Sequence, residues 1–219
     1  MKKLIIIGGH GNGTVAASTV EDLNKRKKEW EIIGFLNDFE ESIYHYPVLG
    51  PISKESVNKY INDFNIFFLY TLITPKFREK SLNKLLDLKI PKEKFATVIH
   101  PTAVVSEFSK IGYGCVIQPL VSVGPGVEID NFVQIFAQSL IGHDARIKDY
   151  GYVANNACVG AKVILEEGAY LGTNCSLLEN IVIGKWAFVG MGSVVIKHVS
   201  NYTKVVGNPT REIGMIDQA

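Results

Sequence analysis

The sequence is poor in cysteine, lacks a long apolar segment at its N-terminus, and has almost no net charge. Its 219 residues include 3 cysteines, which show no CxxC spacing: Cys115, Cys158 and Cys175. We therefore expect no disulfide framework, no metal site and a cytoplasmic location. The N-terminal apolar run ends after Leu4–Ile7, which is too short for a signal peptide or a membrane span. A net charge of +1 gives no electrostatic basis for binding nucleic acid or an anionic membrane.

A strict six-residue period runs through the C-terminal half. Every sixth residue from Ile99 to Val195 is Ile, Leu or Val, without an insertion. The residue four positions later is small or β-branched throughout, and Cys115 and Cys175 fall in this register. We interpret both thiols as buried and unreactive. One large aliphatic residue, one small residue and one turn per repeat are typical of short strands stacked into three-sided coils. The period therefore predicts a parallel β-helix around an aliphatic core.

Glycine often stands directly after the aliphatic residue of the repeat. The glycines in this position are Gly112, Gly124, Gly142, Gly160, Gly172, Gly184 and Gly190. Because glycine tolerates positive φ angles, we expect the chain to turn at these residues.

The first ninety residues follow a different pattern, in which apolar strands alternate with helical segments. The expected elements are strands at 3–7, 31–36 and 66–72 and helices at 14–28 and 77–88. A glycine-rich segment, Gly8–Gly13, joins the first strand to the first helix, as in the βαβ units of a doubly wound sheet. Such a turn can present a helix N-terminus to a phosphate, or it can simply be a tight turn, and its spacing is not G-x-G-x-x-G. Both interpretations remain open at this point.

Five segments of the sequence, taken together, resemble a known enzyme family. They are Gly8–Gly13, Phe35–Asp38, Ile99–Pro101, Ile141–Asp144 and Val206–Pro209. In this order they are similar to the two-domain sugar O-/N-acyltransferases, which acetylate UDP-, GDP- or dTDP-linked 4-amino sugars and have the sialic-acid O-acetyltransferases as relatives. The resemblance implies a Rossmann-like α/β domain at 1–95 that binds the nucleotide sugar. It implies a left-handed parallel β-helix of hexapeptide repeats at 96–219, ending in a C-terminal tail. It further implies a homotrimer with acetyl-CoA between neighbouring β-helices and direct acetyl transfer.

The resemblance also assigns roles to individual residues. His143 matches the family's catalytic base and Asp144 the acidic residue that raises its basicity. The substrate-binding positions are His10, Gly11, Asn12, Asn37 and Asp38. The cofactor-binding positions are Tyr152, Ala161, Thr173 and Met191.

Three positions depart from the family pattern. Tyr152 replaces a histidine that contacts acetyl-CoA in relatives, and Phe136 replaces a frequent asparagine. The segment Tyr70–Leu72 replaces a glycine near the sugar nucleotide. We expect these changes to alter contacts to cofactor or sugar, and so to affect the identity of the substrate more than the reaction class.

A histidine beside an aspartate suits acetyl transfer, because the attacking group must lose a proton and a carboxylate fixes the imidazole tautomer. The leading prediction is N-acetylation of a nucleotide-linked amino sugar. The alternatives are O-acetylation of a sugar hydroxyl and a non-catalytic β-helical binding or scaffold protein.

A zinc enzyme on this fold would need several converging histidines, and between Ile111 and Val195 the sequence contains only His143. We interpret His100, which precedes Pro101, as structural.

Overall fold

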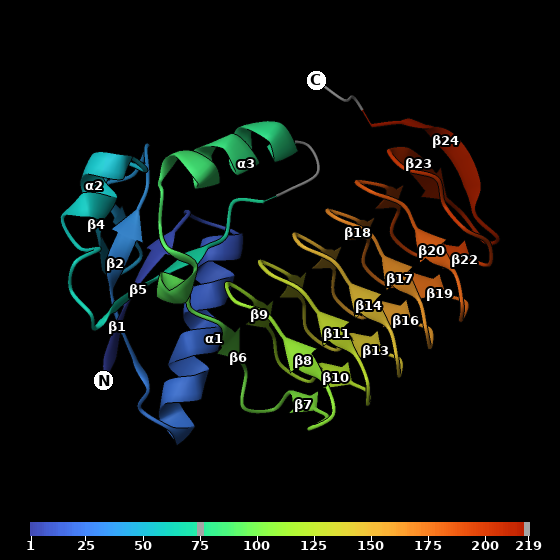
Figure 1. Cartoon of the computed structure of the whole chain (residues 1–219), viewed down its shortest axis with the longest axis horizontal. Coiled ribbons are helices and arrows are strands. Elements are labelled where there is room, and N and C mark those ends of the chain that lie inside the picture. The colour runs from blue at the N-terminus through green and yellow to red at the C-terminus, as the bar shows by residue number, and fades with distance from the viewer. Residues whose placement is uncertain (74–76, 217–219) are drawn as a thin grey trace. The chain divides into compact units, whose positions relative to one another are not determined.

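The computed structural model of the chain describes residues 1–73 and 77–216. The chain divides into two compact units, Met1–Pro101 and Thr102–Ala219. All described helices belong to the first unit, and the second is built from short strands (Figure 1).

The first unit contains a five-stranded sheet in the order β3-β4-β2-β1-β5. Its strands are β1 (Lys2–Ile7), β2 (Trp30–Leu36), β3 (Ser42–Ile43), β4 (Tyr46–Gly50) and β5 (Ile66–Tyr70). Strands β1, β2, β4 and β5 run parallel, while β3 pairs with β4 in the antiparallel sense. Residues Leu4–Ile7 of the central strand are fully buried, as expected for a parallel strand covered on both faces.

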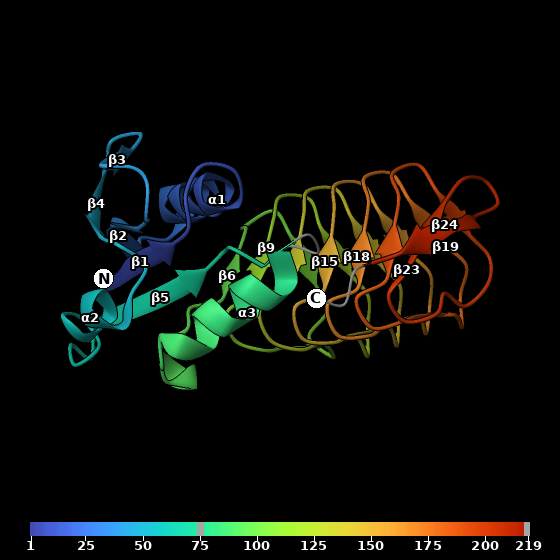
Figure 2. The same cartoon turned by 90° about the horizontal axis from the view of Figure 1, so that it is seen from above.

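The helices of this unit are α1 (Asn12–Arg26), α2 (Lys54–Asn58), α3 (Arg78–Asp87) and a short 3-10 helix, η2 (Lys92–Lys94). Figure 2 shows α1 and α3 on either side of the strands. Helix α1 buries Ala16, Ala17 and Val20, which share one face at helical spacing. The predicted strands and helices are confirmed to within about two residues at each end. The short elements β3, β4 and α2 were not predicted. The segment β6 (Val98–Ile99) follows η2.

The second unit is a left-handed parallel β-helix, which confirms the predicted fold class. Each coil contributes three two-residue strands, and each strand from β7 to β19 pairs with the one eighteen residues later, as Val123 does with Ile141 and Ile141 with Val159. The strands are β7 (Val104–Val105), β8 (Lys110–Ile111), β9 (Val116–Ile117), β10 (Ser122–Val123), β11 (Glu128–Ile129), β12 (Gln134–Ile135), β13 (Leu140–Ile141), β14 (Arg146–Ile147), β15 (Tyr152–Val153), β16 (Cys158–Val159), β17 (Ile164–Leu165), β18 (Tyr170–Leu171), β19 (Ser176–Leu177), β20 (Val182–Ile183), β21 (Phe188–Val189) and β22 (Val194–Val195).

Three sheets form the sides of this β-helix. One side contains β7, β10, β13, β16, β19 and β22, and a second contains β8, β11, β14, β17 and β20. The third side includes β9, β12, β15, β18 and β21. The aliphatic residues of the repeat point inward, so that Ile135, Val159 and Leu171 are 0% exposed.

Cys115 and Cys175 lie in this core, as predicted from their register. Burial raises the pKa of each thiol to about 12. Both thiols are therefore protonated near neutral pH, and neither is a nucleophile there. Cys158 differs from them because it lies on the outer surface of the β-helix.

The prediction that the chain turns at the glycine after each aliphatic residue is wrong. The positive φ angles occur at the residue three positions after the aliphatic one, which we call the turn position. From Gly114 to Gly192 every turn position has a positive φ. The predicted glycines instead allow the next coil to approach closely. A side chain at Gly142 would place its Cβ 2.7 Å from the amide nitrogen of Ala161, and one at Gly172 would place it 2.6 Å from that of Met191.

The segment expected to be a tail forms an antiparallel hairpin of β23 (Thr203–Val206) and β24 (Arg211–Met215). Strand β23 pairs in parallel with β21 and so extends the third side of the β-helix. The connecting loop is held by the amide of Val194, which donates to the Gly207 carbonyl at 2.9 Å. No helix within residues 1–73 and 77–216 is long and apolar enough to cross a membrane.

Candidate functional site

His143 and Asp144 form a hydrogen-bonded pair at one corner of the β-helix. They follow β13 and lie in the turn that leads to β14. His143 Nδ1 lies 2.9 Å from Asp144 Oδ2. Each side chain is 55% exposed, so the pair faces outward rather than into the core.

The backbone of this pair is fixed by the coils on both sides. Asp144 has a φ of 59°, a left-handed conformation that aspartate tolerates better than most residues. Its amide donates to the Pro125 carbonyl of the preceding coil at 3.0 Å. The His143 carbonyl accepts from the Lys162 amide of the following coil at 2.9 Å. Because both backbone positions are tied to neighbouring coils, the side chains start from a fixed geometry.

The hydrogen bond determines which imidazole nitrogen is available for chemistry. A carboxylate can only accept, so Nδ1 carries the proton in the neutral ring and Nε2 has a free lone pair. Within the described residues Nε2 has no hydrogen-bond partner. His143 can therefore accept a proton at Nε2, and Asp144 would stabilise the resulting imidazolium.

The four candidate cofactor residues lie in different places on the β-helix. Ala161 follows β16 and lies one coil beyond His143 at the same corner, whereas Thr173 and Met191 follow β18 and β21 at another corner. Within residues 1–73 and 77–216 the amide N–H groups of these three residues have no hydrogen-bond partner. They are available as donors to a ligand, as predicted backbone contacts require.

Tyr152 lies on a flat side of the β-helix and not at a corner. Its ring packs between Phe136, at 4.6 Å between centroids, and Tyr170, at 4.7 Å. Tyr170 in turn stacks on Phe188. Two of the residues that depart from the family pattern, Phe136 and Tyr152, are thus part of one aromatic row.

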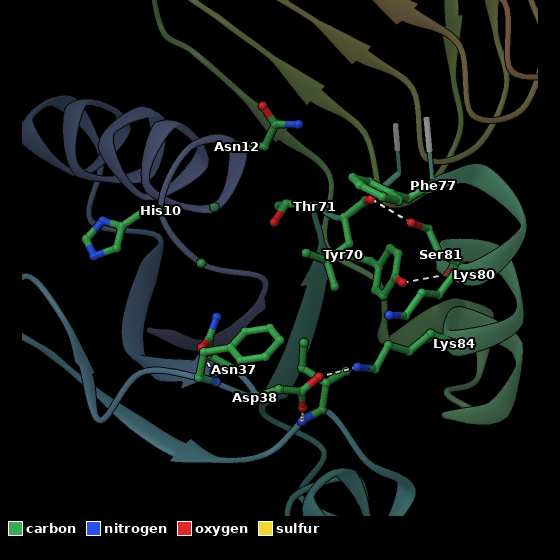
Figure 3. A pocket seen from close by; sticks show the side chains of 15 residues that line it. His10, Asn12, Asn37, Asp38, Tyr70, Thr71, Phe77, Lys80, Ser81 and Lys84 are labelled. Carbon is green, nitrogen blue, oxygen red and sulfur yellow. Dashed lines mark hydrogen bonds and ion pairs between the residues drawn. The ribbon is translucent and has the colours of Figure 1, made fainter. Parts of the chain in front are cut away.

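A second candidate site is a pocket of about 500 Å³ within the first unit (Figure 3). Its walls come from the loop after β1, the loop after β2, the segment after β4, the end of β5 and helix α3 with the residue before it. The lining residues are Gly9, His10, Asn12, Gly13, Asn37, Asp38, Phe39, Ile52, Tyr70, Thr71, Leu72, Phe77, Lys80, Ser81 and Lys84.

Four of the five predicted substrate-binding residues line this pocket, namely His10, Asn12, Asn37 and Asp38. Gly11 does not line it. Gly11 instead caps the N-terminus of α1 with a φ of 89°, a conformation that strongly favours glycine. His10 packs edge-to-face against Tyr44.

Asn37 and Asp38 are already engaged in hydrogen bonds within the protein. Asn37 donates to the Gly8 carbonyl at 3.0 Å and accepts from the amides of Phe39 and Glu40, so it shapes the loop beside the pocket.

Asp38 accepts from the Ile52 amide at 2.7 Å and pairs with Lys84. Burial would raise the pKa of the Asp38 carboxyl, but the bonds from Lys84 and Ile52 and the nearby charge of Lys80 outweigh it and lower the pKa. Asp38 therefore remains a carboxylate near neutral pH.

Helix α3 contributes pocket residues that the sequence analysis missed. Lys80 and Lys84 extend from α3 toward the interior of the pocket (Figure 3). The helix is anchored to the end of β5 because the Tyr70 hydroxyl donates to the Ser81 carbonyl at 2.6 Å and the Ser81 hydroxyl donates to the Leu72 carbonyl at 2.9 Å. The available signal was two lysines four residues apart in the helix predicted at 77–88.

The segment Tyr70–Leu72 forms part of the pocket wall. The Thr71 hydroxyl donates to the Ile7 carbonyl at 3.0 Å and occupies the space that a side chain at Gly8 would need. Thr71 therefore lines the pocket directly beside the glycine-rich loop.

In the described part of the chain, no three His, Cys, Asp or Glu side chains lie close enough to hold a metal ion. His100 is buried, and its Nε2 lies 3.4 Å from Asp22 Oδ2, which supports a structural role.

Known proteins resemble both units. A family model, the PglD N-terminal domain, matches residues 3–85. The GDP-perosamine N-acetyltransferase of Escherichia coli O157:H7 is 34% identical over 170 residues, which cover 71% of this chain and 76% of that protein.

Solved structures resemble the whole chain. The acetyltransferase domain of PglB from Neisseria gonorrhoeae FA1090 is 21% identical and matches with a TM-score of 0.84 over 97% of this chain and 100% of that one. The same domain has been solved in complex with acetyl coenzyme A. PerB from Caulobacter crescentus, in complex with CoA and GDP-perosamine, is 21% identical with a TM-score of 0.81 over 98% of each chain. At these identities the structural similarity establishes the fold.

Proposed function

Because this chain belongs to the hexapeptide-repeat sugar N-acyltransferase family and is an acyltransferase, we propose that it transfers the acetyl group of acetyl-CoA to the amino group of a nucleotide-linked 4-amino sugar. The observation that carries the proposal is the His143–Asp144 pair, whose free Nε2 faces outward at a corner of the β-helix. A protein that only binds ligands has no need of such a pair.

In the proposed reaction the amino nitrogen attacks the thioester carbon, and the carbon–sulfur bond breaks as the tetrahedral intermediate collapses. His143 Nε2 takes the proton that the attacking nitrogen loses, and the same proton can pass to the departing thiolate of CoA. Asp144 holds the Nδ1 proton throughout and stabilises the transient imidazolium. Acetyl and proton are thus both accounted for without an acyl-enzyme.

We further propose that the pocket of the first unit binds the nucleotide. The first two residues of α1, Asn12 and Gly13, line this pocket, and the helix dipole would stabilise a phosphate bound beside them. Lys80 lines the same pocket and has no ion pair among the described residues, whereas Lys84 is paired with Asp38. Lys80 is therefore the cation available to a diphosphate.

Replacing Lys80 with alanine is expected to raise the KM for the nucleotide sugar about 5- to 10-fold, because one charge-assisted contact of roughly 1–1.4 kcal/mol is lost. The KM for acetyl-CoA should not change. Initial rates with either substrate varied test this, with Lys92→Ala as the control because Lys92 lies in η2, outside the pocket. An equal rise in both KM values, or no rise at all, would contradict the assignment.

The positions of the candidate residues favour a site shared between subunits. His143 and Ala161 lie at one corner of the β-helix, and the side containing β13 and β16 separates them from the corner of Thr173 and Met191. A neighbouring copy of the chain could place its Thr173–Met191 corner beside the His143–Ala161 corner of this one. We propose a homotrimer in which acetyl-CoA binds between such corners and accepts hydrogen bonds from their free amide groups.

The proposed function predicts thiol release from acetyl-CoA that depends on an amino sugar nucleotide. A panel of GDP-, UDP- and dTDP-linked 4-amino-4,6-dideoxy sugars, including GDP-perosamine, should contain at least one acceptor. The counterpart with a 4-hydroxyl group should be inactive. Release only with hydroxyl acceptors would indicate an O-acetyltransferase, and no release with any member of the panel would contradict the proposal.

A further inference from the structure

Gly126 lies one coil before Asp144 at the same corner of the β-helix. Both are turn positions, with φ angles of 71° and 59°. A Cβ placed on Gly126 would overlap Asp144 Oδ1 and lie 3.5 Å from Asp144 Cγ. The carboxylate that bonds to His143 thus occupies the space above this glycine.

The backbone conformation does not explain why glycine stands at this position. Most turn positions have a similar positive φ and carry a side chain: Leu120, Phe132, Gln138, Asp144, Tyr150, Asn156, Lys162, Asn174, Asn180 and Trp186. Glycine is therefore not required for the turn itself.

Three of the four turn glycines are covered by the side chain eighteen residues later. A Cβ on Gly114 would lie 2.6 Å from the Phe132 ring, and one on Gly168 would overlap the Trp186 ring. The fourth, Gly192, has nothing within 4 Å of such a Cβ. At Gly114 and Gly168 the covering group is a large aromatic ring, whereas at Gly126 it is a small carboxylate. The Asp144 carboxylate lies over Gly126 with its Oδ1 atom and contacts His143 Nδ1 with its Oδ2 atom.

We propose that Gly126 is a positioning residue, whose missing side chain provides the space in which Asp144 turns toward His143 Nδ1. This inference rests on the proposed function in that His143 serves as the base. The overlapping atom, Oδ1, is the end of a flexible side chain, so a methyl group at Gly126 would displace the carboxylate rather than disrupt the coil. The expected damage is to the orientation of the imidazole and not to the fold.

The direct test is the tautomer of His143, measured by ¹⁵N NMR of the histidine-labelled protein above the pH at which the ring is protonated. In the wild type Nδ1 should carry the proton. Gly126→Ala should increase the Nε2-protonated fraction toward that of Asp144→Ala. Gly126→Asn, which places at this turn a residue already present at Asn156 and Asn174, should do the same with less backbone strain. An unchanged tautomer in both variants would overturn the proposal.

Gly192→Ala is the matched control for strain. Its φ of 67° is close to that of Gly126, and its Cβ would meet nothing. The two alanine variants should therefore show melting temperatures within about 2 °C of each other, since both suffer the same backbone strain. A much lower value for Gly126→Ala would indicate a general packing role and would contradict the proposal.

Steady-state kinetics distinguish a role of Gly126 in positioning Asp144 from an effect of Gly126 that is independent of Asp144. Gly126→Ala should lower kcat about 5- to 50-fold and leave the KM for acetyl-CoA unchanged. In the Asp144→Ala background the same change should alter kcat by less than about twofold, because no carboxylate remains to be displaced. A full additional loss in that background would show that Gly126 acts independently of Asp144. If the wild type acetylates no acceptor, the proposed function fails, while the tautomer measurement still decides the role of Gly126.

Discussion

His143→Ala is expected to lower kcat by about 10²–10⁴-fold, the usual contribution of a general base, or roughly 3–5 kcal/mol of activation free energy. The affinity for acetyl-CoA should hardly change, because the proposed cofactor contacts come from backbone amides. Asp144→Asn should cost less, about 10- to 100-fold, since it weakens the bond that orients the ring and leaves the base in place. Combining both changes should add little to the histidine change alone, because the carboxylate acts through the imidazole.

Steady-state kinetics on the best acceptor of the nucleotide-sugar panel test these values. His45→Ala is the matched control, because His45 is an exposed histidine that does not line the pocket. If His143→Ala retained kcat within about threefold of wild type while chemistry limited the rate, His143 would not be the base.

Mixed assemblies are expected to recover activity from two defective chains. The first partner is His143→Ala. The second is Met191→Glu, in which a carboxylate at an 80% exposed position would repel the phosphates of CoA. If each site takes His143 from one subunit and Met191 from its neighbour, random mixing in equal amounts restores about a quarter of the sites.

The assemblies can be prepared by co-expression, and light scattering should return three times the chain mass of 24.2 kDa. Activity of the mixture should then rise far above that of either parent. Activity no greater than the mean of the two parents would show that the site is contained within one chain. A monomer at micromolar concentration would contradict the shared site in a different way, because no neighbour would be present.

The β-helix could be predicted from the sequence because every coil obeys the same local rule. An aliphatic residue such as Ile141 and a small one such as Ala145 recur in fixed register, and each pairs with its counterpart in the next coil. The role of glycine could not be predicted in the same way. Positive φ and close approach of another chain segment both favour glycine, and only the structure shows that Gly142 serves the second purpose.

The first unit was predictable where its strands are long and apolar, as in Leu4–Ile7. The elements β3, β4 and α2 are short and depend on contacts made after folding. Strand β4, for example, is positioned by Tyr46, whose hydroxyl donates to Glu21 at 2.6 Å. Burial and this bond raise the pKa of the Tyr46 hydroxyl, so it remains a donor. No local pattern in the sequence indicates this long-range contact.

The same distinction between local sequence patterns and long-range contacts applies to the candidate sites. His143 and Asp144 are adjacent in sequence, so their pairing follows from local geometry. The contribution of Lys80 to the pocket depends on where α3 docks, which is decided by the Tyr70–Ser81 hydrogen bond. The spacing of residues along the sequence does not show where α3 docks against the sheet.

The constant separation of eighteen residues between paired strands from β7 to β22 has a consequence for how the β-helix folds. Each new coil closes a loop of the same short length on a template that already exists, so the entropic cost of each step is the same. Folding can then proceed as propagation along one axis, with a slow first coil and fast additions. The hairpin of β23 and β24 ends this propagation on one side of the β-helix, because its antiparallel return covers the strand edge on which another chain could otherwise continue the stack.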